Sequence, residues 1–121
     1  MGEFKIDVLY EGNNNEIVII QPRGYIDAIT YTDVEETIAN QLAQKYYKII
    51  INLAQCEYVN SSGWGVFIRE IKEIRKNNGD LVLVNMLPDV YMVYDTMEFS
   101  KILKSLASLQ EGISYFCSDE D

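Results

Sequence analysis

Alternating apolar and polar residues at the start of the chain predict a β-hairpin. Apolar side chains recur at every second position over residues 4–10, which is the period of a strand, and the opposite face is partly polar. A turn rich in Gly and Asn follows at residues 11–15, and the apolar run at residues 17–20 predicts the second strand. Pro22 has no amide hydrogen to donate, so we expect it to end this strand or to lie at a bulge.

A helix with one buried face is predicted after the hairpin. Thr32 and Glu35 fit a capping box, in which each side chain bonds the backbone amide of the other residue, and Thr30 is a rival cap. We expect this helix to end near Lys45. Its apolar side chains recur every four residues and form one stripe, which consists of Val34, Ile38 and Leu42.

Two further strand–helix units follow. The β-branched run at residues 48–53 predicts a strand that is buried on both faces, at the centre of a sheet. The helix after it has apolar residues at spacings of three and four: Trp64, Phe67, Ile68, Ile71 and Ile74. We expect Gly79 to supply a left-handed cap at its end. Residues 81–84 predict another strand, and Pro88 begins a helix that runs to about Met97.

The order of the elements predicts the fold class. A short strand at residues 102–103 and a helix capped by Ser108 that extends through Phe116 complete the pattern. Strand–helix–strand units require parallel pairing and right-handed connections. The sequence therefore predicts an α/β fold with a mostly parallel central sheet, an antiparallel edge strand and about four α-helices. We expect a single domain over residues 1–117 and an acidic C-terminal tail at residues 118–121.

Composition and charge narrow the classes of function. The chain has 121 residues with 10 basic and 19 acidic side chains, a net charge of −9. Such a charge repels phosphate backbones, so we do not expect nucleic acid as a partner. The sequence has no signal-peptide pattern and no apolar stretch of roughly 18 residues, so we expect a cytoplasmic protein without membrane insertion.

The residues of common catalytic and metal sites are missing. The chain has no histidine, which is the commonest general base and the commonest zinc ligand. The sequence contains neither the P-loop pattern GxxxxGK[ST] nor the GxSxG elbow of hydrolases. Two cysteines imply no disulfide framework, and we interpret Cys56 as a buried structural thiol. We expect no metal, no cofactor and no enzymatic activity.

The segment at residues 58–65 is the most informative part of the sequence. It joins the carboxyl end of the predicted central strand to a helix, and sites of open α/β sheets usually lie at that rim. A helix N-terminus has free amide donors that can bind an anion, although Ser61 or Ser62 could simply cap the helix. Gly63 and Gly65 each cost the helix roughly 1 kcal/mol relative to Ala, which predicts close approach by another group.

Three segments in this order resemble the STAS domain family of anti-sigma factor antagonists. Residues 24–27, Gly-Tyr-Ile-Asp, resemble the family's Gly-x-Leu-Asp at the end of the second strand. Residues 49–65 resemble its strand, loop and Asp-Ser-Ser/Ala-Gly-x-Gly signature, and residues 88–95 resemble its Pro-x-Val helix. The likeness covers roughly residues 4 to 117.

The resemblance implies a switch based on phosphorylation. The unphosphorylated antagonist binds an anti-sigma factor that is also a serine kinase, and this binding frees the sigma factor and so regulates transcription. The kinase phosphorylates the first serine of the signature, here Ser61, and a serine phosphatase resets the switch. The resemblance places four residues around the phosphorylation site: Asp27, Asn60, Ser62 and Gly63. The candidate partner contacts are Tyr25, Tyr58 and Trp64.

Two departures from the family pattern keep alternatives open. Asn60 stands where phosphorylated members carry Asp, and Asn keeps a hydrogen bond but no charge. This favours an alternative, a STAS binding or scaffold module that acts in a signalling or transport assembly without phosphorylation. Trp64 replaces the usual Leu and fits either core packing or the partner surface. A nucleophilic Ser61 is a third hypothesis, but without histidine it lacks an ordinary base.

Overall fold

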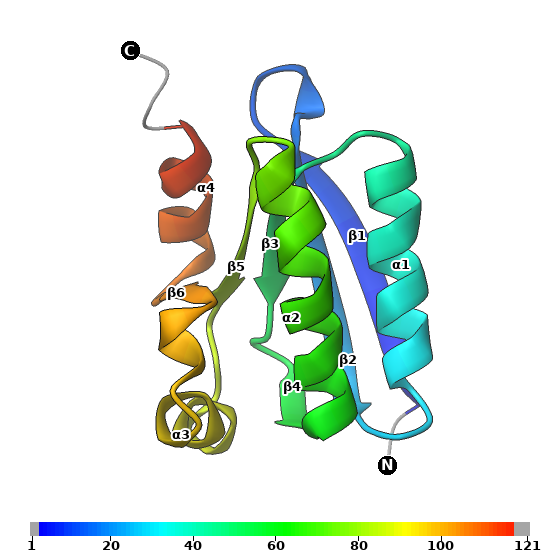
Figure 1. Ribbon diagram of the computed structural model, residues 1–121, viewed down its shortest axis with the longest axis vertical. Helices are drawn as coiled ribbons and strands as arrows, with labels where there is room; N and C mark the ends of the chain where they lie inside the picture. The colour runs from blue at the N-terminus through cyan, green and yellow to red at the C-terminus, as the bar shows by residue number, and fades with distance from the viewer. Residues whose placement is uncertain (1–2, 118–121) are drawn as a thin grey trace.

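The computed structural model describes residues 3–117 and has one mixed sheet with helices on both faces (Figure 1). The strands are β1 (Lys5–Glu11), β2 (Ile17–Ile26), β3 (Lys48–Asn52), β4 (Cys56–Val59), β5 (Asp80–Val84) and β6 (Lys104–Leu106). The α-helices are α1 (Tyr31–Ala43), α2 (Ser61–Lys76), α3 (Pro88–Thr96) and α4 (Leu109–Cys117). Two short 3-10 helices complete the described chain, η1 (Asn13–Asn15) and η2 (Phe99–Lys101).

The sheet has the strand order β1-β2-β3-β5-β6, and β4 pairs with β2 beyond the end of β3. β1 pairs antiparallel with β2, whereas the other pairs are parallel. This confirms the predicted α/β fold with an antiparallel edge strand and four α-helices. The predicted acidic tail lies outside the described residues.

The core lies on both faces of the sheet. α1 and α2 run side by side across one face, and their buried residues, among them Ile38, Phe67 and Ile74, meet the apolar side chains of the strands (Figure 1). On the other face, α4 buries Phe116 against a smaller cluster that includes Ile50. Each large side chain buried in this way contributes roughly 1.5–3 kcal/mol before entropy is subtracted.

The expectation that Pro22 would end the second strand or lie at a bulge was wrong. β2 continues to Ile26 and pairs with β1 over residues 17–23, with Ile6 opposite Pro22. On its other side, β2 pairs with β3 over residues 17–20 and with β4 from Gly24 onward, where the register shifts between Gly24 and Tyr25. Pro22 lies between these two parallel partners, so its missing amide hydrogen leaves no parallel ladder bond unmade.

Sequence reasoning missed β4. Cys56 and Val59 are buried while Glu57 and Tyr58 between them are exposed, so the strand shows no alternation of apolar and polar residues. β4 lengthens the sheet beside the carboxyl end of β2 and leads directly into α2. The buried position of Cys56 confirms its interpretation as a structural thiol.

Several predicted element ends need correction. α1 begins at Tyr31 with Thr30 as its N-cap residue, and Thr32 donates to the carbonyl of Ile29, so the capping box at Thr32 was wrong. The last strand is β6 rather than residues 102–103. Other details agree, since Pro88 opens α3 and the Ser108 hydroxyl accepts a hydrogen bond from the amide of Glu111 in α4.

The end of α2 also differs from its prediction. Asn78, with φ 65°, takes the left-handed conformation that was expected of Gly79. Gly79 is required for another reason, because a Cβ atom there would lie 1.9 Å from the carbonyl oxygen of Tyr47. Within residues 3–117, no helix is long and apolar enough to cross a membrane.

Candidate functional site

Ser61 lies exposed at the first position of α2. The cap of this helix is Asn60, whose Oδ1 accepts a hydrogen bond from the amide of Gly63 at 3.0 Å. The alternative that Ser61 or Ser62 caps the helix was therefore wrong. The Ser61 hydroxyl makes no hydrogen bond with any of residues 3–117, so it is available at the surface.

Gly63 allows the first turn of α2 to press against the ends of two strands. A Cβ atom at this position would lie 2.7 Å from Cγ2 of Ile26 in β2 and 2.8 Å from Cγ1 of Val59 in β4. At Gly65, the nearest atom to such a Cβ is Nη1 of Arg69 at 3.1 Å, the far end of a flexible side chain. The predicted close approach is thus confirmed at Gly63, whereas Gly65 has only a neighbour that can move.

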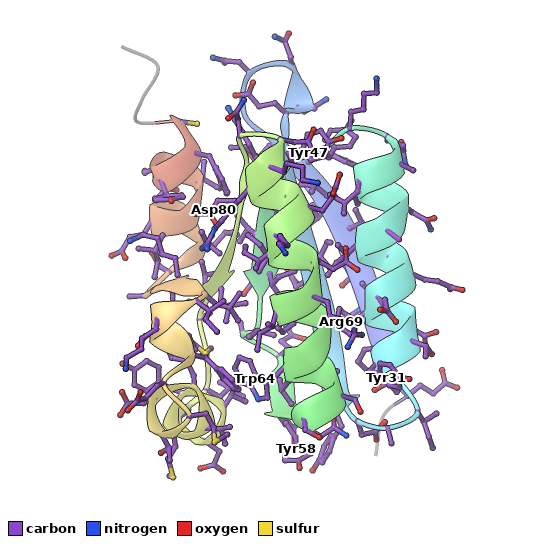
Figure 2. The ribbon with its side chains drawn as sticks, viewed as in Figure 1. Tyr31, Tyr47, Tyr58, Trp64, Arg69 and Asp80 are labelled. Carbon is purple, nitrogen blue, oxygen red and sulfur yellow. The ribbon has the colours of Figure 1, made fainter. Side chains whose placement is uncertain are left out.

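Trp64 is a core residue, which corrects its prediction as a partner contact. Its side chain is only 3% exposed. The centroid of its indole ring lies 4.9 Å from the ring centroid of Phe99, 6.1 Å from that of Phe67 and 6.2 Å from that of Tyr94. Figure 2 shows it between α2 and the α3 region. Trp64 therefore packs the start of α2 against α3 and η2, and the core-packing interpretation holds.

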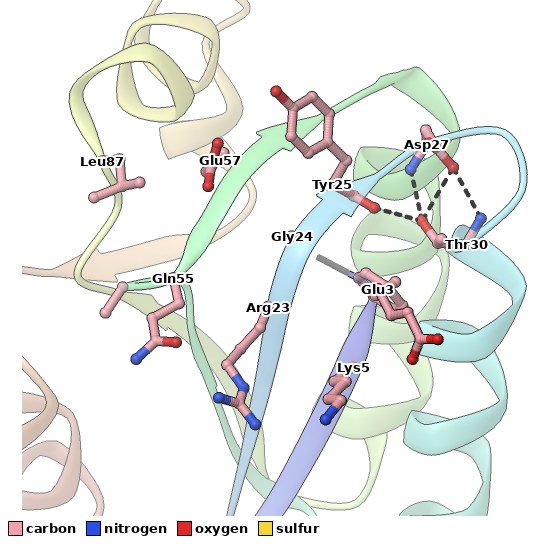
Figure 3. A pocket seen from close by; sticks show the side chains of 12 residues that line it. Glu3, Lys5, Arg23, Gly24, Tyr25, Asp27, Thr30, Gln55, Glu57 and Leu87 are labelled. Carbon is pink, nitrogen blue, oxygen red and sulfur yellow. Dashed lines mark hydrogen bonds between the residues drawn. The ribbon is translucent and has the colours of Figure 1, made fainter. Parts of the chain in front are cut away.

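Asp27 organises the loop that joins β2 to α1. Its Oδ1 accepts hydrogen bonds from the amides of Ile29 at 2.9 Å and Thr30 at 3.0 Å. The Thr30 hydroxyl donates to the carbonyl of Tyr25 at 2.6 Å; Figure 3 shows the bonds among Tyr25, Asp27 and Thr30. The hydrogen bonds from the amides of Thr30 and Ile29 hold the pKa of Asp27 below its usual value. The carboxylate is thus engaged within its own loop and makes no hydrogen bond with Ser61 in the described chain.

The Asp27 loop and Ser61 lie at the same end of the sheet. The amide of Asn60 donates a hydrogen bond to the carbonyl of Ile26 at 2.9 Å, and Ile26 is also the register partner of Val59. In Figure 1, the loop after β2 and the start of α2 are both at the lower end of the molecule. Asn60, Ser62 and Gly63 surround Ser61 in the sequence, and the bond between Asn60 and Ile26 brings the Asp27 loop to the same end of the sheet.

Tyr25 and Tyr58 form an exposed aromatic pair at this end. They face each other across the β2–β4 pairing with ring centroids 6.0 Å apart, and they are 55% and 47% exposed. Exposed aromatic side chains on rigid strands are typical of protein–protein interfaces. Sequence reasoning missed Ile29 nearby, which is 82% exposed; its one signal is an isolated apolar residue in a loop.

An open cavity of about 1300 Å³ lies beside Tyr25 (Figure 3). Its charged lining has both signs: Lys5 and Arg23 are basic, and Glu3, Asp27 and Glu57 are acidic. Arg23 Nε lies 3.1 Å from Oδ2 of Asp7, which partly neutralises the charge of Arg23. No group of three or more metal-ligating side chains occurs among residues 3–117.

The chain belongs to the STAS domain family, because the family model described as STAS domain matches residues 11–112. Among curated proteins, it is similar to the anti-sigma-B factor antagonist of Bacillus subtilis. The two are 27% identical over 108 residues, which cover 89% of this chain and 97% of that relative.

Solved structures agree on the fold. An anti-sigma factor antagonist from Mycobacterium paratuberculosis superposes with a TM-score of 0.79 at 19% identity, covering 92% of this chain and 93% of that one. The Bacillus cell fate determinant SpoIIAA in its phosphorylated form superposes with a TM-score of 0.68 at 21% identity, covering 94% of this chain and 99% of that one.

Proposed function

We propose that this protein is an anti-sigma factor antagonist that binds an anti-sigma factor with serine kinase activity, and that phosphorylation of Ser61 ends this binding. The observation that carries the proposal is the exposed Ser61 with an unbonded hydroxyl, at the sheet end that also presents Tyr25 and Tyr58. The name of the Bacillus subtilis relative supports the antagonist role. The phosphorylated form of SpoIIAA supports modification of a protein with this fold.

The start of α2 is suited to carry a phosphate. The amides of Ser61 and Ser62 make no hydrogen bond with other described residues, and the helix dipole places positive charge at this end. A phosphate adds about −1.5 to −2 charges. The helix stabilises this charge, so the fold is retained while the contact surface changes. A loss of only 1.4 kcal/mol weakens binding tenfold.

The antagonist role also defines the partner, which is the anti-sigma factor. An antagonist that captures the anti-sigma factor releases the sigma factor for transcription, and a serine phosphatase restores the bare Ser61. The protein then acts in the cytoplasm by binding rather than by catalysis.

Asn60 favours a second candidate function. Its neutral amide replaces the Asp of phosphorylated members, while its Oδ1 still caps α2. In this alternative, the protein is a constitutive STAS binding or scaffold module, and Ser61 stays unmodified.

Phosphosite mass spectrometry on the protein purified from its own cells, in growth and under stress, separates the two candidates. Trypsin releases residues 49–69 as one peptide, which contains Ser61 and Ser62, so fragment ions must locate the phosphate. A phosphate on Ser61 whose occupancy changes between the states supports the switch. Complete coverage of the peptide with Ser61 bare in both states favours the constitutive module.

A further inference from the structure

Ile29 has the greatest exposure of the large apolar residues that reach the surface in the described chain, at 82%. It lies in the turn between β2 and α1, beside the acidic Asp27. A single exposed apolar residue is ordinary on protein surfaces. Ile29 differs because hydrogen bonds hold its loop and charged side chains lie at the same end of the sheet.

The loop holds Ile29 in a fixed conformation. Asp27 Oδ1 accepts from the amide of Ile29 itself and from the next amide, Thr30. The Thr30 hydroxyl in turn donates to the carbonyl of Tyr25 and accepts from the amide of Asp27 at 2.9 Å. A side chain presented by an ordered loop loses little conformational entropy on binding, which is the property of an anchor residue.

The charged side chains at the end of the sheet that carries Ile29 indicate which class of molecule can bind there. The cavity beside Tyr25 is lined by more acidic than basic side chains: Glu3, Asp27 and Glu57 against Lys5 and Arg23. Arg23 is paired with Asp7, so acidic charge is in excess at this end. A second copy of the chain would bring another net charge of −9, and an anionic membrane would also be repelled. A protein surface with basic side chains around an apolar centre is complementary to this end.

We propose that Ile29 is an anchor residue that enters an apolar pocket, rimmed by lysine or arginine, on a partner protein, with Asp27 and Thr30 as positioning residues. The proposal rests on the proposed function in one respect, because the partner expected there is the anti-sigma factor.

A photo-crosslinking amino acid at position 29 of the full chain, expressed in its own cells, identifies the occupant. The matched position is Leu9 on β1, which is 48% exposed and opposite Ile19, seven residues before the end of β2. The protein joined at position 29 but not at position 9 is then purified. Its affinity is measured by calorimetry for wild type, Ile29→Ala and Leu9→Ala.

We expect Ile29→Ala to weaken binding at least about tenfold and Leu9→Ala to leave it within about threefold. Asp27→Ala should weaken binding while Asp27→Asn restores it, because an amide oxygen can still accept both hydrogen bonds. A merely structural role of Asp27 would instead lower thermal stability without a change in affinity.

The remaining outcomes separate this inference from the proposed function. If the crosslinked protein is not an anti-sigma factor but Ile29→Ala still weakens its binding, the anchor role of Ile29 is supported and the proposed function is contradicted. If an anti-sigma factor binds wild type and Ile29→Ala equally, the anchor role of Ile29 is contradicted while the proposed function is supported. Crosslinks that form only to a second copy or to lipid contradict the anchor role, and so does the absence of any crosslink at position 29.

Discussion

The amide of Asn60 donates a hydrogen bond to the carbonyl of Ile26, at 2.9 Å, and so joins the start of α2 to the loop after β2. Ser61 follows Asn60 directly, and Asp27 follows Ile26. One backbone bond thus holds the phosphorylation-site candidate beside the loop that presents Ile29. A change of charge at Ser61 therefore falls next to the surface that we assign to the partner.

The two glycines in the first turn of α2 should respond oppositely to alanine. Gly63→Ala should lower the free energy of unfolding by about 1–3 kcal/mol, because its Cβ would overlap Ile26 and Val59. Gly65→Ala should leave stability unchanged or raise it by up to about 1 kcal/mol, since only Arg69 Nη1 must move. Urea unfolding of both variants measures the difference; equal effects would contradict the packing of α2 described above.

The N-cap of α2 should depend on the acceptor at position 60. Asn60→Ala should lower the free energy of unfolding by about 1 kcal/mol, because the Gly63 amide loses its acceptor. Asn60→Asp keeps that acceptor and adds a negative charge that the helix dipole favours, so stability should not fall. Denaturant titration checks both changes, with the exposed Asn40→Ala in α1 as the control; a stable Asn60→Ala variant would refute the cap.

Cys56 should be shielded from thiol reagents. Burial raises its pKa from 9.0 to about 11. Between these values the thiol ionises in the unfolded state only, so the free energy of unfolding should fall as the pH rises from about 9 to 11. At neutral pH, Ellman's reagent should modify the half-buried Cys117 first. In Cys117→Ser, fast labelling without denaturant would show that Cys56 is exposed.

The exposed tyrosines and the buried tryptophan should differ in partner binding. Tyr25→Ala and Tyr58→Ala should each weaken affinity for the anti-sigma factor roughly tenfold, as expected of exposed aromatic contacts. Trp64→Phe should lower stability but leave affinity within about threefold, because the indole lies within the core. Calorimetric titration gives the affinities. A loss of affinity confined to Trp64→Phe would reverse the assignment.

The patterns of apolar residues in the sequence were sufficient to predict the main helices and strands. Val34 and Ile38 of the predicted helix stripe are buried, as is the β-branched run of β3. The third member, Leu42, is only half-buried, and Gln41 beside it is buried instead. Local signals were insufficient for β4, where Glu57 and Tyr58 face solvent in succession and hide the strand period. The strand exists because β2 extends far enough to pair with it, which is a property of the tertiary fold.

The candidate site was predictable in its members but less so in their roles. The signature around Ser61 placed Asn60 and Gly63 at the start of a helix, yet only the structure shows that Asn60 is the cap. Trp64 could not be assigned from spacing, because a residue in the first turn borders both the core and the surface. Ile29 belongs to no motif, and the anchor role that we propose for it rests on its exposure and on the hydrogen bond that its amide donates to Asp27.

The most direct test of the switch is calorimetric titration of the anti-sigma factor with wild type, Ser61→Ala, Ser61→Asp and Ser62→Asp. We expect Ser61→Ala to bind like wild type and Ser61→Asp to bind at least about tenfold more weakly, equal to 1.4 kcal/mol or more. Ser62→Asp, which adds the same charge at the half-buried neighbour, should lose less affinity. Equal affinities of Ser61→Asp and wild type would contradict a switch at Ser61.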